Sequence, residues 1–429
     1  MNSSFLNLFI FAAVIFLRGF KSGITKDPSG MLTSWKKGTD CCPRDGVSCR
    51  NSNRVVVLTL RIESDDAGIF LSGTISPSLA KLHTFTSRTT GPLPANIGAL
   101  SNLDTLTVKG NRFTGPIPSS LSNLTRLNYL NLGGNLLTGA IPLGFANLKL
   151  LSNLNLDDNR LSGTIPNIFK SMTKLRILTL SRNRFSGKLP SSMASLAQTL
   201  AFLELSQNNL SGSIPSYLSR FNKLDTLDLS KNRFSGAVPK SLAKLTKIAN
   251  INLSHNLLTD PFPVLNVTYD VLTLDLSYNI FHMETIPEWV KSASILNSLK
   301  LAKCGIKMSL DDWKPRQTDL YVSIDLSENE ISGSPVRFLE KEQQLREFWM
   351  SGNKLRFDIG NLKLTKTLET LDLSRNLVFG KVPATVAGLK TLNLSQNHLC
   401  GKLPVTNFSA RAFAGNDCLC GSPLSPCKV

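Results

Sequence analysis

Hydrophobic and polar residues alternate in a short motif that returns through most of the chain. In "TLDLSKN", Leu227 and Leu229 are expected to point into a core. Thr226, Asp228 and Ser230 are expected to face the other way, because successive side chains of a strand point to opposite faces. Stacked copies predict a parallel sheet. Each copy closes with a segment such as "SLAKLTKI", whose leucines return to the core at helical or 3₁₀ spacing.

The motif "LxLxxN" sets the period of the chain. Its last residue falls at positions 111, 135, 159, 183, 208, 232, 256, 279, 304, 329, 353, 376 and 397, which are 21 to 25 residues apart. An inward amide at this position can satisfy the backbone groups of the turn, as a buried polar group must. Position 304 carries a cysteine instead, and we expect it to fill the slot as a small buried thiol. The period is typical of leucine-rich repeats.

The longer pattern "NxLSGxIPxxLxxLxxL" resembles the plant-specific class of leucine-rich repeats. Copies include "NRFTGPIPSSLSNLTRL", "NRLSGTIPNIFKSMTKL" and "NNLSGSIPSYLSRFNKL". This class occurs in receptor-kinase ectodomains, receptor-like proteins and polygalacturonase-inhibiting proteins. The resemblance implies an α/β repeat solenoid: a superhelix with a long parallel concave sheet, a short second strand near "SGxIP" and disulfide caps. We assign the solenoid to residues 54–397, with about 13 clear units.

Two stretches depart from the repeat. The glycines at positions 73 and 91 are 18 residues apart instead of 24, so residues 61–91 are predicted to be degraded and about one strand short. Residues 260–320 lack the usual loop pattern, and an irregular convex side is predicted there.

Residues 1–23 contain an apolar run and read as a signal peptide with an uncertain cleavage site, the alternative being an uncleaved anchor. Together with the absence of a second apolar run of spanning length, this predicts a secreted, extracellular protein. Membrane contact would then arise only through a partner or through the uncleaved anchor.

Residues 398–429 resemble the C-terminal cap of polygalacturonase inhibitors, down to the run "CLCGSPL". That resemblance implies disulfides Cys400–Cys418 and Cys420–Cys427, as expected in an oxidising compartment. Zinc is the alternative for four such cysteines, but their spacing fits no zinc finger.

Residues 24–53 resemble a truncated N-terminal cap. The family pattern implies Cys42–Cys49 and leaves Cys41 without a partner, because no cysteine precedes it. Cys41 could be a free thiol, an intermolecular disulfide site, or mispaired with Cys49. The interpretation we favour is a leftover residue without function.

Charge narrows the choice of partners. The formal net charge is +18, which favours acidic partners. An extracellular location argues against nucleic acid as the partner. Asp228, Ser254 and His255 would lie on neighbouring strands, but "LSHN" is the ordinary "LSxN" of the repeat. We therefore predict no enzyme activity, and no cofactor or metal site.

What remains is a surface for a protein ligand. The residue between the two strand leucines is exposed on the concave sheet, and the position three residues later lies in the following turn. Exposed aromatic residues beside charges are typical of interface anchors, and Trp349 is the strongest candidate. Alternatively, Asp in "LDLS" is simply a default repeat residue. The predicted partner-binding residues are Glu204, Asp228, His255, Asp275, Tyr278, Asp325, Trp349 and Asp372.

Glycosylation sequons lie at Asn123, Asn209, Asn252, Asn266, Asn393 and Asn407. Asn252 and Asn393 fall in the concave column, so glycans there would obstruct binding. Surplus basic residues such as Lys240, Lys244 and Lys247 are expected on the convex side, where they could hold the protein on anionic pectin.

The resemblance implies a defence-related cell-wall protein that docks a microbial wall-degrading enzyme such as polygalacturonase and blocks substrate access. Inhibition rests on the analogy, because one fold serves many ligands. The alternatives are a signalling adaptor that binds a peptide or a plant receptor, and a non-functional truncated paralogue.

Overall fold

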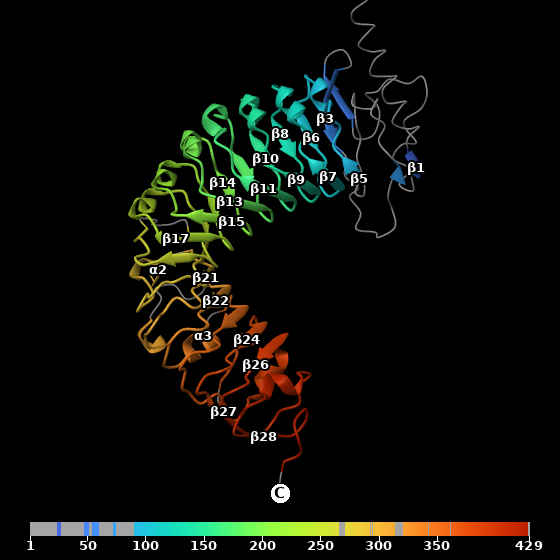
Figure 1. The fold of residues 1–429 in the computed structure, drawn as a ribbon. Helices are drawn as coiled ribbons and strands as arrows, with labels where there is room; N and C mark the ends of the chain where they lie inside the picture. Colours follow the sequence, from blue (N-terminus) through green and yellow to red (C-terminus); the bar gives the residue numbers. More distant parts are fainter. Residues whose placement is uncertain are drawn as a thin grey trace, which may run out of the picture. The chain divides into compact units, whose positions relative to one another are not determined.

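The computed structural model describes residues 24–26, 47–50, 54–59, 72–73, 90–265, 271–291, 293, 295–313, 321–341, 343–360 and 362–427. The proposed signal peptide, Cys41, Cys42 and Asn266 lie outside these residues, and so does the Cys42–Cys49 pairing. The chain divides into two compact units, Met1–Leu224 and Asp225–Val429. Figure 1 shows stacked repeats in each unit, with strands on one side and helical turns on the other.

The first unit carries a long sheet, with one short strand from each repeat. Its strands are β2 (Val47–Arg50), β3 (Arg54–Thr59), β6 (Thr105–Thr107), β8 (Tyr129–Asn131), β10 (Asn153–Asn155), β12 (Ile177–Thr179) and β14 (Phe202–Glu204). β2 pairs with β3 in antiparallel fashion, and the pairs from β3 onward are parallel. β3 pairs directly with β6, with Leu58 opposite Leu106. Leu58 and Leu106 are 48 residues apart in the sequence, about twice the period of the repeat.

A second parallel sheet follows the "SGxIP" segments of the first unit, as the resemblance implies. Its strands are β5 (Thr90–Pro92), β7 (Arg112–Pro116), β9 (Leu136–Gly139), β11 (Arg160–Thr164), β13 (Arg184–Gly187) and β15 (Asn209–Gly212). Two further short strands, β1 (Ile24–Lys26) and β4 (Ser72–Gly73), pair with each other. The 3₁₀ helices are η3 (Ile97–Ala99), η4 (Ser119–Asn123), η5 (Leu143–Asn147), η6 (Phe169–Ser171), η7 (Ser191–Leu196) and η8 (Ser216–Arg220).

The second unit continues the same plan, with one short parallel strand from each repeat. The strands are β16 (Thr226–Asp228), β18 (Asn250–Asn252), β20 (Thr273–Asp275), β21 (Ser298–Lys300), β22 (Ser323–Asp325), β23 (Glu347–Trp349), β24 (Thr370–Asp372) and β26 (Thr391–Asn393). Each strand pairs in register with the next, so equivalent residues form rows across the sheet.

Among the described residues between 260 and 313, the side opposite this sheet is irregular, as predicted. The second sheet contains β17 (Arg233–Ala237) and β19 (Leu257–Thr259) and resumes, among the described residues, only at β25 (Phe379–Gly380) and β27 (His398–Lys402). Among the described residues of this unit, short α-helices lie between successive strands of the long sheet: α2 (Glu288–Lys291) between β20 and β21, and α3 (Val336–Lys341) between β22 and β23. The 3₁₀ helices of this unit are η9 (Lys240–Lys244), η10 (Leu310–Asp312), η11 (Ala384–Gly388) and η12 (Ala410–Phe413).

The alternation of each strand builds the core. Leu227 and Leu229 are 1% and 0% exposed, as the pattern predicts. The prediction that Ser230 faces outward is wrong, because this side chain is buried and its hydroxyl donates to Asp228 at 2.7 Å. The strand ends at the aspartate, so the alternation does not extend to the serine that follows it.

The repeated asparagines form a ladder of buried amides. Asn256 donates from Nδ2 to the carbonyls of Leu229, Leu253 and Ser254, and its Oδ1 accepts from the Phe234 N–H at 2.9 Å. Each amide therefore connects its own turn with the preceding repeat. These bonds explain why a polar side chain is retained at a buried position.

Cys304 occupies the asparagine slot as a buried free thiol. Its Sγ lies 3.5 Å from the Leu276 carbonyl and 3.7 Å from the Ala302 carbonyl, where the amide donates in other repeats. Burial, with smaller effects of nearby carboxylates, raises the pKa of this thiol far above its usual range.

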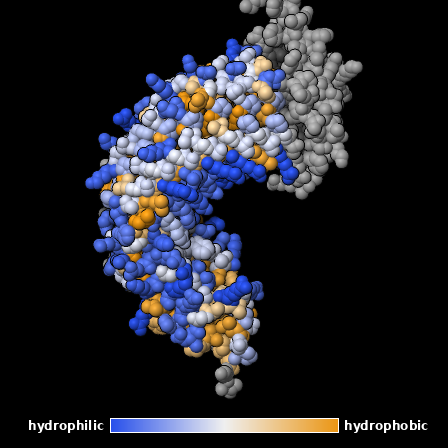
Figure 2. All heavy atoms as spheres, viewed as in Figure 1, coloured by the Kyte–Doolittle hydropathy of each residue, from blue (hydrophilic) through white to orange (hydrophobic). Residues whose placement is uncertain are grey.

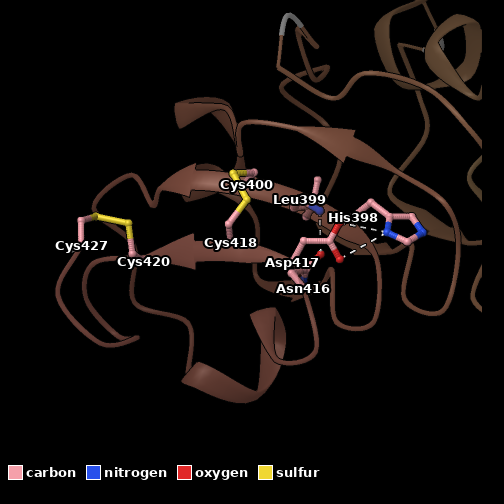
Figure 3. Close-up of a disulfide and its surroundings, with 8 residues drawn as sticks. All are labelled: His398, Leu399, Cys400, Asn416, Asp417, Cys418, Cys420 and Cys427. Carbon is pink, nitrogen blue, oxygen red and sulfur yellow. Dashed lines mark hydrogen bonds and ion pairs between the residues drawn. A yellow bond between two sulfur atoms is a disulfide. The ribbon is translucent and has the colours of Figure 1, made fainter. Parts of the chain in front are cut away.

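The C-terminal end is closed by two disulfides, Cys400–Cys418 and Cys420–Cys427, which are the pairs that the resemblance implies (Figure 3). Cys400 and Cys418 lie opposite each other on β27 and β28 (Cys418–Cys420). Asn416 continues the asparagine ladder, since its Nδ2 donates to the Leu394 carbonyl at 3.0 Å. The sequence pattern missed this last rung because no "LxLxx" strand precedes it.

Candidate functional site

The residues at the strand ends of the second unit form one continuous row on the outer face of its long sheet. In order along the sheet they are Asp228, Asn252, Asp275, Lys300, Asp325, Trp349, Asp372 and Asn393. Neighbouring strands of a sheet are about 4.8 Å apart, so each side chain is within reach of the next. We call these eight residues the strand-end row.

A shared turn fixes the aspartates of this row. The Oδ1 atom of Asp228 accepts from the Ser230 N–H at 2.9 Å. Asp275 and Asp325 likewise accept from the N–H of the serine two residues later, each at 3.0 Å. Asn252 makes it as well, at 3.1 Å to the Ser254 N–H. Because an amide can replace the carboxylate in this role, the turn alone does not require a negative charge.

The turns contribute a second row, in which the backbone adopts positive φ. These residues are Lys231, His255, Tyr278, Lys303, Glu328, Gly352, Arg375 and Gln396. The sequence assigned several of them to the surface but gave no sign of the left-handed backbone, which polar residues adopt more readily than β-branched ones.

The two aromatic residues of the turn row stack on each other. The rings of His255 and Tyr278 are parallel within 11°, and their centroids are 4.6 Å apart. Partial burial and the neighbouring Lys231 lower the pKa of His255, although Asp275 opposes this shift. Burial raises the pKa of Tyr278, Asp325 and Glu328 add to this shift, and Arg375 opposes it. At neutral pH the stack therefore presents a neutral aromatic surface beside charged neighbours.

Trp349 and Asp325 are more enclosed than the sequence suggests. Tyr278 is exposed as expected, at 39%, whereas the Trp349 side chain, which was expected to be exposed, is half-buried. Burial raises the pKa of Asp325, and hydrogen bonds from Ser327 oppose that effect. A carboxylate that is partly desolvated before any partner binds has less hydration to lose when it binds.

Glu204 occupies the corresponding strand-end position of β14, in the first unit. The other seven predicted partner-binding residues lie together in the second unit, on the strand-end row or the turn row. The second unit is therefore the better candidate for a single docking surface.

Ser254, the serine of the Asp228, Ser254 and His255 group, makes a hydrogen bond within its own turn. The Ser254 hydroxyl donates to Asn252 Oδ1 at 2.7 Å, and His255 stacks on Tyr278. Asp228 accepts from Ser230 and thus serves its own turn. In the part of the chain that the structure describes, no three metal-binding side chains come together, and no helix is long and apolar enough to cross a membrane.

The sequons differ in their surroundings. Asn123, Asn209 and Asn407 are exposed, whereas Asn252 and Asn393 are half-buried in the strand-end row. Asn393 also donates to Asp372 at 3.3 Å. Lys240, Lys244 and Lys247 are exposed on and after η9, away from the long sheet, as expected. The surface visible in Figure 2 is mainly hydrophilic, with hydrophobic residues in small separate groups.

Models of known families match several parts of the chain. The leucine rich repeat family matches residues 101–161, 149–210, 223–245 and 388–408, and the leucine rich repeat N-terminal domain matches residues 14–50. The polygalacturonase inhibitor 2 of Phaseolus vulgaris is 38% identical over 111 residues, which are 24% of this chain and 32% of the relative. The DNA damage-repair/toleration protein DRT100 of Arabidopsis thaliana is 34% identical over 112 residues, which are 22% of this chain and 30% of the relative.

These matches span about a third of the length of the curated relatives. Among solved structures, the Arabidopsis receptor kinase HAESA, in complex with the peptide hormone IDA and the co-receptor SERK1, is similar over 94% of this chain and 78% of that one. The TM-score is 0.69 and the sequence identity 26%. The predicted fold class and the resemblance to inhibitors and receptor ectodomains are thus confirmed.

Proposed function

Because this chain is a leucine-rich-repeat protein similar to polygalacturonase inhibitors and to plant receptor ectodomains, we propose that it is an extracellular protein-binding protein of the plant cell wall. We further propose that it inhibits a microbial wall-degrading enzyme such as a polygalacturonase. The enzyme would dock on the strand-end and turn rows of the second unit and lose access to its substrate.

The observation that carries this proposal is the composition of the docking surface. Asp228, Asp275, Asp325 and Asp372 place four carboxylates on one sheet face of a chain whose net charge is +18. Aromatic side chains lie among them. Lys300 is the one basic residue of the same row. A row that combines an aromatic anchor with mostly acidic side chains favours a protein partner of complementary charge.

Inhibition of fungal polygalacturonases by the purified full chain tests the proposal, after circular dichroism has shown that the protein is folded. Trp349→Ala removes the aromatic anchor and Asp228→Lys reverses one charge of the docking surface. We expect each to weaken inhibition, Trp349→Ala by about 30-fold, as for a hot-spot residue worth about 2 kcal/mol. Lys170→Ala, on an exposed helical turn of the first unit, is the matched control. Folded protein that inhibits no enzyme of a broad panel would refute the proposal.

A second candidate function is a signalling adaptor that binds a peptide or a plant receptor. It is supported by the similarity to the HAESA ectodomain, which was solved with a peptide hormone and a co-receptor. Calorimetric titration with secreted plant peptides and with receptor ectodomains tests this function. Binding to one of them, without inhibition of any polygalacturonase, would favour the adaptor.

Anionic pectin is proposed as an additional ligand. Residues 90–224 contain 13 lysines and arginines but only 4 acidic residues, and Lys240, Lys244 and Lys247 add exposed cations in the second unit. Contacts of this kind are screened by salt. We expect retention on immobilised polygalacturonate that is lost as the salt concentration rises. Equal retention on fully methyl-esterified pectin would contradict a charge-based contact.

A further inference from the structure

Trp349 lies between two carboxylates of the strand-end row. β22, β23 and β24 pair in register, with Asp325 opposite Trp349 and Trp349 opposite Asp372. Phe348 and Met350, its neighbours in sequence, are buried, so the indole projects from the outer face of the sheet. With strands about 4.8 Å apart, both carboxylates border the indole.

The turn that anchors each aspartate also holds its carboxylate in place. Oδ1 of Asp325 accepts from the Ser327 N–H at 3.0 Å, and Oδ1 of Asp372 accepts from the Ser374 N–H at 2.9 Å. The backbone N–H of the turn binds Oδ1 in each case, and Oδ2 of Asp372 also accepts from the neutral amide of Asn393 at 3.3 Å. The charge of both groups is therefore fixed beside the indole without being neutralised by the turn.

An ion pair lies in the turns that follow the strands of Asp325 and Asp372. Arg375 donates to Glu328, and the two residues belong to the repeats on either side of the one that carries Trp349. The turn of the Trp349 repeat has Gly352, so no side chain separates the pair. A Cβ at position 352 would lie 3.1 Å from the Glu328 carboxylate, a close contact that the glycine avoids.

A fourth carboxylate lies at the start of β23. Glu347 precedes Trp349 by two residues on the same face of β23, and the Ser323 hydroxyl donates to its Oε2 at 2.9 Å. The indole is thus framed by four carboxylates and by one guanidinium that is already paired. Lys300 lies beyond Asp325, one strand further from the indole.

We propose that this frame seats one cationic side chain of the protein partner on the indole face of Trp349, between Asp325 and Asp372. An aromatic face attracts a cation, and carboxylates at its edges add charge complementarity. An arginine suits the frame better than a lysine, because its planar guanidinium stacks on an indole and donates to two carboxylates together. This inference rests on the proposed function, since it names the chemistry that the partner presents to the docking surface.

Fluorine NMR of the full chain labelled with 5-fluorotryptophan tests the seat without any enzyme. The chain has four tryptophans, and Trp349→Phe identifies the signal of interest. We expect N-acetyl-arginine amide to shift that signal saturably. The neutral isostere N-acetyl-citrulline amide should produce a shift several-fold smaller at equal concentration.

Asparagine substitutions then remove the charge and keep the turn, because Asn252 forms the same turn naturally. The double variant Asp325→Asn/Asp372→Asn should bind N-acetyl-arginine amide at least ten-fold more weakly. Asp358→Asn is the matched control: Asp358 is exposed, and its Oδ1 accepts from the Gly360 N–H at 2.8 Å. It should leave the affinity unchanged.

The seat is refuted if the Trp349 signal does not respond to arginine, if citrulline shifts it equally, or if the double variant binds as tightly as the wild type. The two proposals can fail separately. A chain that binds arginine at Trp349 but inhibits no polygalacturonase refutes the proposed function alone. A chain that inhibits a polygalacturonase equally well with and without both aspartates refutes the seat alone.

Discussion

Replacing Asn256 by alanine tests whether the buried amide ladder holds the repeats together. The side chain is 6% exposed and makes four hydrogen bonds, three from Nδ2 to carbonyls and one from the Phe234 N–H to Oδ1. Alanine removes all four and leaves a small cavity between two repeats.

The loss of stability depends on which hydrogen bonds remain to the backbone groups that Asn256 contacts. The Leu229 carbonyl still accepts from Asn232, and the Leu253 carbonyl still accepts from Asn279. The Ser254 carbonyl likewise still accepts from the Lys231 N–H. The Phe234 N–H loses the acceptor seen in the structure, and an unsatisfied buried donor costs about 1–3 kcal/mol. With a smaller loss from the three shared bonds, we expect about 3 kcal/mol of destabilisation.

Urea unfolding monitored by far-ultraviolet circular dichroism measures this loss. Asn222→Ala is the control, because Asn222 is exposed and donates to Gln198 at the surface. Surface substitutions of this kind usually change stability by less than about 0.5 kcal/mol. If Asn256→Ala costs no more than Asn222→Ala, the amide ladder does not stabilise the stack as argued.

Three further predictions concern the cap, the helical turns and a buried charge. Replacing Cys400 and Cys418 by serine should cost about 2–4 kcal/mol and lower the melting temperature, in a thermal scan without reductant. Gly98→Ala should destabilise the protein by more than about 1 kcal/mol, because the added Cβ would lie 1.9 Å from the backbone carbonyl oxygen of Ser120 in the next helical turn. Gly388→Ala is the control: the space around Gly388 is open, so this variant should be neutral or slightly stabilising in the same thermal scan. Asp325→Asn should stabilise the protein at pH 7. Burial raises the pKa of the Asp325 carboxyl in the folded state above its ordinary value of 3.8. The wild-type protein therefore loses stability as the pH rises from 3.8 through the raised pKa, and the asparagine variant does not. Urea midpoints at several pH values should show that this gain disappears below pH 3.8, and a gain that persists there would contradict a charge effect.

The repeat pattern predicts most of the core because one motif is subject to the same physical constraint thirteen times. Each pair of strand leucines must be buried, and each buried amide must be bonded, so the period by itself predicts the sheet and the asparagine ladder. The pattern does not predict the last rung at Asn416, which follows η12 where the other rungs follow a strand of the long sheet. It also misjudges Ser230, since alternation holds only while the chain remains extended.

The candidate site was predictable only as a list of positions. Spacing from the asparagines identifies Asp325, Trp349 and Asp372 as members of one row, and the structure pairs them in that order. Nothing in the sequence predicts the Glu328–Arg375 ion pair, whose members are 47 residues apart and meet because Gly352 leaves room between them.

The sequence by itself therefore determined the fold class, because the fold class depends on local periodicity. The disulfide pairs of the C-terminal cap were predicted from the resemblance to a known cap, and the structure contains them. The tertiary structure decided which polar residues are buried, which rings stack and which charges pair. These features depend on contacts between neighbouring repeats, and such contacts exist only after the repeats have stacked.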